Sequence, residues 1–177
     1  MDWMLMPLRK YAQFSGRSQR KEFWMWVLFL VILNVVAVVI DRLLGFGRTT
    51  VVTSPTFTSA VTQSYGPARG LLMLGTLLPN LAVSVRRLHD IDRTGWWVLA
   101  PLIPYVIGGA LMISALVSAG TGTPNVSGLA AGGIFFLIGG ILAIVLLVFY
   151  CLDGTKGTNR FGSDPKGSMP DLAERFS

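Results

Sequence analysis

The chain has 177 residues, of which 52% are hydrophobic and only 14% are charged; its formal net charge is +6 and its mean hydropathy is +0.59. Soluble domains carry roughly 25% charged residues, so this composition excludes an ordinary soluble protein and indicates an integral membrane protein. No polar stretch reaches the roughly 100–150 residues of an independent soluble domain, so we expect a single membrane domain over residues 1–177.

The first fourteen residues have the pattern of a short amphipathic helix, which we expect to lie in the membrane interface. One side of its helical wheel is apolar: Met4, Leu5, Leu8, Tyr11, Ala12 and Phe14. Charged and polar residues, including Arg9 and Lys10, fall on the other side. A disordered basic tail is the alternative, because Pro7 lacks a backbone donor.

Four apolar stretches predict transmembrane helices at about 23–40, 70–85, 96–117 and 129–152. The second is the shortest, at about 24 Å, so its flanking arginines would have to reach up to the headgroups. We therefore predict an all-α membrane protein, a bundle of four transmembrane helices. The loop 47–66 is rich in Thr, Ser and Val, and forms either a short hairpin or no regular structure.

Lysine and arginine are distributed unevenly between the two sides of this topology. Five lie before the first span, three between spans two and three, and four in the tail 153–177, out of fifteen in the chain. Only Arg42, Arg48 and Arg69 lie on the other side. Because positively charged loops stay in the cytoplasm, we expect both termini to be cytoplasmic. Charge at the ends of spans favours attraction to anionic lipid, not to nucleic acid.

The predicted spans contain no Asp, Glu, Lys, Arg or His, the residues that mark ion and proton pathways, which disfavours a proton-coupled transporter. Asn34 and Thr76 lie at similar depths in spans one and two, so we expect them to bond across the helices and stabilise their packing.

Small residues recur at helical spacing in spans three and four: Ala110, Ser114 and Ser118 in one, Gly139 and Ala143 in the other, with further glycines beside them. Such faces let helix backbones approach closely. They predict either a tight helix pair within one chain or a homo-oligomer, and the pattern alone leaves both open.

The loop after the second span combines charge with aromatic residues. Its arginines are Arg86, Arg87 and Arg93, and it ends in Trp96 and Trp97. Guanidinium groups suit phosphate, and indole rings prefer the headgroup layer, so this loop is one of two things: a docking site for a phosphate-bearing lipid, or the ordinary anchor described next. The alternative is ordinary anchoring, with the arginines paired to Asp90 and Asp92.

His89 is the only histidine and Cys151 the only cysteine, so we expect no multi-histidine metal site and no cofactor. The tail from Asp153 is rich in D-G, G-S and D-P pairs and predicts consecutive tight turns. Two other basic segments lie on the same side of the membrane, the one before the first span (14–24) and the loop after the second span (86–97). We expect Asp153, Asp164 or the backbone carbonyls of 153–162 to lie within hydrogen-bond reach of an arginine from one of them.

Three segments together resemble the bacterial inner-membrane family catalogued as domain of unknown function 805. They are F-S-G-R-S-Q-R-K-E-F-W from Phe14, R-R-L-H-D from Arg86 with the following Trp pair, and G-T-N-R-F-G-S-D-P from Gly157. The resemblance implies a small multi-pass protein of the bacterial inner membrane. It implies no established reaction or ligand.

We therefore expect a non-enzymatic membrane protein whose basic cytoplasmic surface binds anionic headgroups or a partner. The candidate residues are Arg17, Arg20, Arg86, Arg87, His89, Arg93, Trp96, Trp97 and Arg160. The alternative is an oligomeric small transporter or channel with Asn34 and Thr76 lining its path. A third class, a lipid-modifying enzyme, would use His89 with Asp90 or Asp92 as acid and base.

Overall fold

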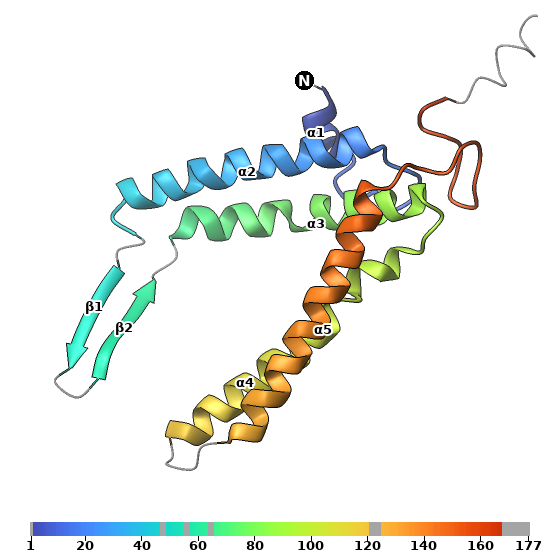
Figure 1. Cartoon of the computed structure of the whole chain (residues 1–177). Coiled ribbons are helices and arrows are strands. Elements are labelled where there is room, and N and C mark those ends of the chain that lie inside the picture. The colour runs from blue at the N-terminus through green and yellow to red at the C-terminus, as the bar shows by residue number, and fades with distance from the viewer. Residues whose placement is uncertain (1, 47–48, 55–56, 64–65, 121–124, 168–177) are drawn as a thin grey trace, which may run out of the picture. The chain divides into compact units, whose positions relative to one another are not determined.

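The computed structural model describes residues 2–46, 49–54, 57–63, 66–120 and 125–167 (Figure 1). The elements are α1 (Asp2–Arg9), α2 (Arg20–Leu43), β1 (Thr49–Ser54), β2 (Phe57–Gln63), α3 (Pro67–Asp90), the 3₁₀ helix η1 (Gly95–Leu99), α4 (Leu102–Gly120) and α5 (Val126–Cys151). Arg48 in the first loop and the part of the tail after residue 167 lie outside the described residues.

Contacts gather in two compact units. The first contains residues Met1–Gln13 and Lys21–Ala82, and the second contains Phe14–Arg20 and Val83–Ser177. Helix α3 contributes to both, with its last turns in the second unit. The expectation of a single domain stays a prediction, and each unit is described by itself.

Four helical stretches in the described ranges are long and apolar enough to cross a membrane, as predicted. The first three stretches extend beyond both ends of their predicted spans, whereas the fourth starts three residues before its predicted span and ends one residue short of it. The helix that contains the short second span is longer than the span itself: α3 runs for 24 residues, about 36 Å, through Arg86 and Arg87 to Asp90, and the part of it that crosses the membrane stays a prediction. The first and fourth likewise become Arg20–Leu43 and Val126–Cys151. Runs without charge underestimate these helices, because charged residues at helix ends are still helical.

The third span is not one regular α-helix. It opens as η1, and α4 begins only at Leu102, so the predicted helix 96–117 is interrupted at Ala100 and Pro101. Pro101 has no backbone N–H, so it cannot donate to the turn before it, and the regular α-helix starts only after this residue; Ala100 itself keeps α-helical backbone angles.

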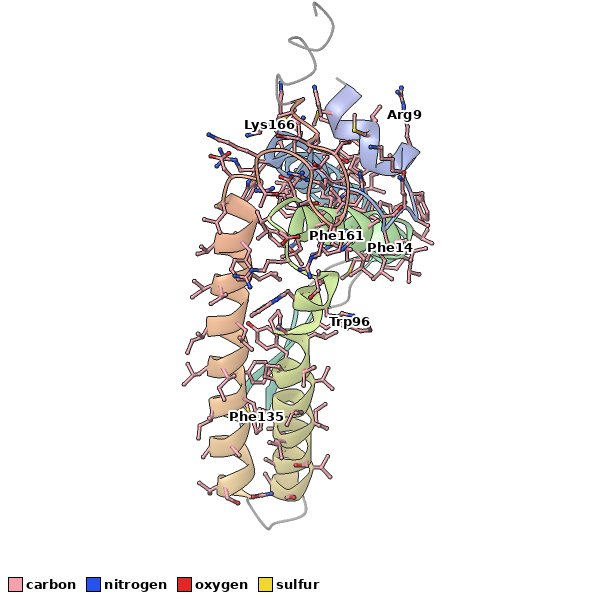
Figure 2. The ribbon with its side chains drawn as sticks, turned by 90° about the vertical axis from the view of Figure 1, so that its right-hand side faces the viewer. Arg9, Phe14, Trp96, Phe135, Phe161 and Lys166 are labelled. Carbon is pink, nitrogen blue, oxygen red and sulfur yellow. The ribbon has the colours of Figure 1, made fainter. Side chains whose placement is uncertain are left out.

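Helices α4 and α5 pack closely against each other, so the predicted tight pair within one chain is confirmed. A Cβ on Gly108 would lie 3.1 Å from the carbonyl oxygen of Gly132, and Gly139 lies under the ring of Tyr105. Phe135 lies between the two helices (Figure 2). The contact face on α4 differs from the predicted one: Ala110 and Ser114 are exposed, and the Ser114 hydroxyl donates to a carbonyl of its own helix.

The predicted N-terminal helix exists but is shorter than its apolar pattern. It ends at Arg9, so Tyr11 and Phe14 lie beyond it. The Tyr11 hydroxyl donates to the carbonyl of Gly75 on α3, 2.8 Å away, which ties the segment after α1 to that helix. A position in the membrane interface stays a prediction.

The connection between α2 and α3 contains an antiparallel hairpin of β1 and β2, the first of the two possibilities for this loop. After it, α3 starts against the end of α2. The Asp41 carboxylate accepts from the backbone N–H groups of Ala68 (2.9 Å) and Arg69 (3.2 Å), and its residue is only 3% exposed. An acidic side chain from α2 thus caps the N-terminus of α3.

Candidate functional site: the polar cap

Three segments distant in the sequence fold together within the second unit. They are residues 14–20, the end of α3 with the following loop (86–93), and the tail 152–167; together we call them the polar cap. Backbone bonds already join them: the N–H of Ser18 donates to Arg86 and that of Thr155 donates to Asp90. The three motifs that resemble one family therefore form one structure.

Asp90 is the centre of the polar cap. One carboxylate oxygen accepts from Arg17 Nε at 3.0 Å and the other from Arg87 Nη1 at 2.5 Å. All three residues are buried, with 2%, 7% and 0% exposure. A buried carboxylate is costly to desolvate unless charged partners and hydrogen bonds surround it, and here two guanidinium groups do so.

Arg17 connects Asp90 to the tail. Its Nη1 donates to the carbonyl of Gly157 at 2.6 Å, and its Nη2 donates to that of Thr155 at 2.5 Å. Arg20 adds an ion pair with Asp153 at 2.6 Å. The predicted contact between the tail and an arginine of another motif is therefore confirmed.

Arginines also close the C-terminus of α5. The last carbonyls of a helix have no partner within it and carry partial negative charge. The carbonyl of Tyr150 accepts from Arg87 Nε at 3.2 Å, that of Cys151 accepts from Arg20 at 2.8 Å, and Arg87 also donates to Leu152. Arg87 thus joins the end of α5 to the buried Asp90.

His89 stacks on Phe161 in the tail, with ring centroids 3.9 Å apart and nearly parallel planes. Its Nδ1 lies 3.2 Å from the carbonyl of Gly16. Asn159 donates to the backbone carbonyl of His89 at 2.9 Å, so the tail contacts both the ring and the backbone of this residue. Among the described residues, no group of three or more His, Cys, Asp and Glu side chains is arranged to hold a metal ion.

The tail folds as the predicted tight turns. Asn159 and Gly162 exchange two backbone bonds, and both Gly157 and Gly162 have positive φ. Asp164 accepts from the backbone N–H of Lys166 and from that of Gly157. These bonds, the one from Lys166 first, lower the pKa of Asp164, and a bond from the Lys166 ammonium likewise lowers the pKa of Asp153.

The remaining predicted site residues differ in exposure. Arg160 pairs with Asp92 at 3.0 Å, both exposed. Arg93 lies over the ring of Phe149, against which Trp97 packs edge-on. Arg86 is buried, whereas Trp96 is 77% exposed and points away from the helix pair (Figure 2).

A polar cavity of about 230 Å³ lies in the polar cap beside the end of α5. Its lining residues are Asp90, Asp153, Gly154, Lys156, Asp164 and Lys166. Sequence reasoning pointed to the arginines but missed Lys156, Lys166 and the central role of Asp90. The one available signal was the density of charge in the tail, because the sequence contains no periodic pattern there.

The expected bond between Asn34 and Thr76 is not formed. The Thr76 hydroxyl donates to the carbonyl of Leu72 in its own helix at 2.7 Å. A hydroxyl in an apolar helix can satisfy itself one turn back, and this competes with a bond to another helix.

Comparison with known proteins extends these findings. Residues 11–163 match the family described as "Protein of unknown function (DUF805)". Inner membrane protein YhaI of Escherichia coli (strain K12) is 34% identical over 167 residues, which cover 94% of this chain and 97% of the relative. Inner membrane protein YhaH of the same strain is 34% identical over 166 residues, covering 94% and 98%. No solved structure matches. The chain therefore belongs to the DUF805 family, in agreement with the three motifs that build its polar cap.

Proposed function

We propose that this inner-membrane protein binds the phosphate of an anionic lipid headgroup in its polar cap, on the cytoplasmic side of the membrane. The cavity beside the end of α5 is the observation that carries this proposal. Asp153 is only the second residue after α5, and a cavity next to the end of a candidate span supports a site at the level of the headgroups.

The positive charge comes from the surface as a whole and not from the cavity lining alone. The lining contains three carboxylates, Asp90, Asp153 and Asp164, and two ammonium groups, Lys156 and Lys166. Arg17, Arg20 and Arg87, which are bonded to Asp90 and Asp153, raise the number of positive groups to five and support binding of an anion. Lys156 makes no hydrogen bond or ion pair within the described ranges, so its ammonium is available to a ligand.

The predicted site residues take two different roles in this proposal. Arg17 and Arg87 are buried and bonded to Asp90 and to tail carbonyls, so they hold the surface in shape. The lipid is instead contacted by the exposed cations Lys156 and Lys166 of the cavity and by Trp96, whose indole suits the headgroup layer. The alternative, a transporter path lined by Asn34 and Thr76, gains no support from Thr76, which bonds within its own helix.

The proposal is tested by the lipid that remains bound in mild detergent. Protein is exchanged into micelles containing equal phosphatidylglycerol and phosphatidylethanolamine, purified, and its retained lipid measured by mass spectrometry. We expect phosphatidylglycerol to be enriched, and Lys156→Gln to lower that enrichment about fivefold, because it removes an ammonium group that lines the cavity and is worth about 1 kcal/mol of attraction to an anionic headgroup.

Lys10→Gln is the matched control, because it removes the same charge outside the polar cap. It should leave the enrichment unchanged. Equal retention of both lipids by the wild type would refute headgroup binding. The proposed orientation is tested separately by reporter fusions at the C-terminus, which should report a cytoplasmic location.

A further inference from the structure

Asn34 is a polar side chain near the middle of a membrane span. It lies fourteen residues after the start of α2, about 21 Å along a helix of about 36 Å. Its side chain is half-buried, and no hydrogen bond to any of the described residues satisfies it. Hydrocarbon offers no partner to an amide, so leaving this group unpaired costs free energy.

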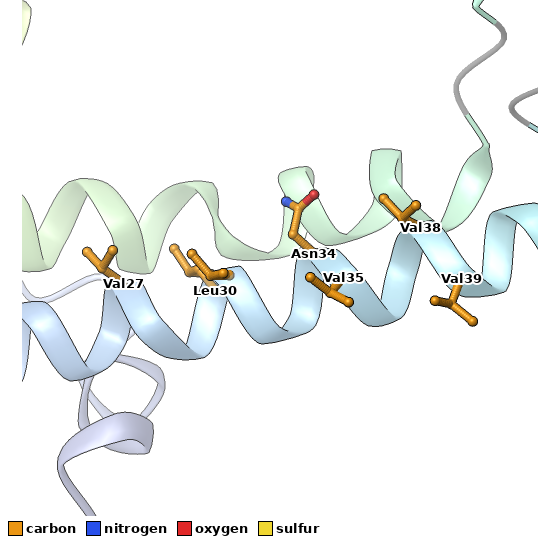
Figure 3. Close-up of a pocket in the computed structure, with 7 residues that line it drawn as sticks. Val27, Leu30, Asn34, Val35, Val38 and Val39 are labelled. Atoms are coloured by element: carbon orange, nitrogen blue, oxygen red, sulfur yellow. The ribbon is translucent and has the colours of Figure 1, made fainter.

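Asn34 lies in a groove of about 440 Å³, and the described residues that line it all belong to α2. The close-up shows the amide standing among aliphatic side chains (Figure 3). Val27, Val31, Asn34 and Val38 follow one another at spacings of four, three and four residues. This alternation of four and three residues is the spacing of a helix face that packs against a second helix by knobs-into-holes contacts. Asn34 is the one polar residue on that face.

We propose that this face of α2 binds α2 of a second copy of the chain, with the two Asn34 amides bonded to each other. An amide both donates and accepts, so it is complementary to itself across a two-fold axis. Two copies of the chain inserted into the membrane in the same orientation also have their Asn34 residues at the same depth, so the two amides can meet. A partner helix of another protein would have to supply a matching polar group at that depth by coincidence.

The glycines packed between α4 and α5 are already used within one chain: Gly108, Gly132 and Gly139 are buried there. Ala110 and Ser114 remain exposed on α4, but the Ser114 hydroxyl is satisfied within its own helix, whereas the Asn34 amide is not. Self-association is therefore assigned to α2, and it does not depend on lipid binding by the polar cap.

Cysteine cross-linking in native membranes tests the geometry, in a background with Cys151→Ser. Val31→Cys places a thiol on the groove, and Val36→Cys places one on the opposite face; both positions are about half exposed. Oxidation should produce a covalent dimer at least tenfold more efficiently from Val31→Cys. Equal yields, or a cross-link to a different protein, would overturn the proposal.

The amide is tested by the dimer fraction of labelled protein diluted in lipid vesicles. Asn34→Val should weaken dimerisation about three- to tenfold, the usual effect of losing such a bond between spans. Asn34→Gln keeps the amide and should retain most of the dimer. Asn80→Val, which removes an exposed asparagine from α3, should have no effect. A wild type that stays monomeric at every protein-to-lipid ratio, or an unaltered dimer in Asn34→Val, would refute the inference.

Discussion

The N-terminus of α3 and the C-terminus of α5 are both closed by charged side chains from other segments, but in different ways. One carboxylate, Asp41, accepts from the first N–H groups of α3. At α5, Arg87 and Arg20 donate to the last carbonyls, and Arg87 is itself held by the buried Asp90. In both cases the charge of the side chain is opposite to the partial charge at that end of the helix, which stabilises the helix. The first is a local cap, whereas the second depends on a charge network, so it should be far more sensitive to substitution.

Asp90→Ala should produce the largest effect. It leaves Arg17 and Arg87 buried without their anion, which typically costs about 3–5 kcal/mol. Unfolding by titration with a denaturing detergent measures the change in free energy. Asp92→Ala breaks only the exposed pair with Arg160 and should cost at most about 1 kcal/mol. Similar losses in the two variants would contradict a buried centre at Asp90.

Gly66→Ala should disturb the α3 end next most strongly. A methyl group there would overlap the Asp41 carboxylate, and such overpacking costs about 1–3 kcal/mol. Gly70→Ala is the control, because its added methyl group meets open space. The same unfolding titration should show a loss of stability in Gly66→Ala and not in Gly70→Ala. If Gly66→Ala is as stable as the wild type, the contact of Asp41 with the N-terminus of α3 is loose.

Asp41→Ala should cost less, about 0.5–2 kcal/mol, because it removes one helix cap. Asp41→Asn keeps an acceptor oxygen and should retain most of the stability. Hydrogen exchange at the amides of Ala68 and Arg69 is the direct measurement, and faster exchange is expected only in the alanine variant. Unchanged exchange in Asp41→Ala would mean that another group satisfies these amides.

The sequence predicts some regions of this protein well and others poorly, because only some features leave a local pattern in the sequence. Charge-free runs located the four spans, and the placement of the three motifs on one side predicted their meeting. The sequence predicted that the tail would meet an arginine of another motif, but not which arginine would meet which group. The individual partners of Arg17, Arg20 and Arg87 could not be assigned, because most are backbone carbonyls, which every residue possesses. Asp41 was missed for a related reason: it caps a helix that starts 26 residues later, beyond the reach of any local pattern.

Acid should loosen the tail by a smaller amount. The pKa values of Asp153 and Asp164 are lowered, so the stabilisation is present above the ordinary value of 3.8 and is lost as pH falls through the lowered values. A spin label at Ser163→Cys, with Cys151→Ser, should remain restricted from pH 7 to 5 and become progressively more mobile as the pH falls below the ordinary value of 3.8. The same mobility in Asp164→Asn as in the wild type at pH 7 would show that this carboxylate does not hold the turns.

Hydrogen exchange of the tail amides tests most directly whether the three motifs form one folded polar cap. In the wild type, the amide of Thr155, bonded to Asp90, and that of Gly157, bonded to Asp164, should be protected. Arg17→Gln should remove that protection from both while the amides within α5 keep theirs. Tail amides that exchange in the wild type as fast as an unstructured peptide would contradict the account.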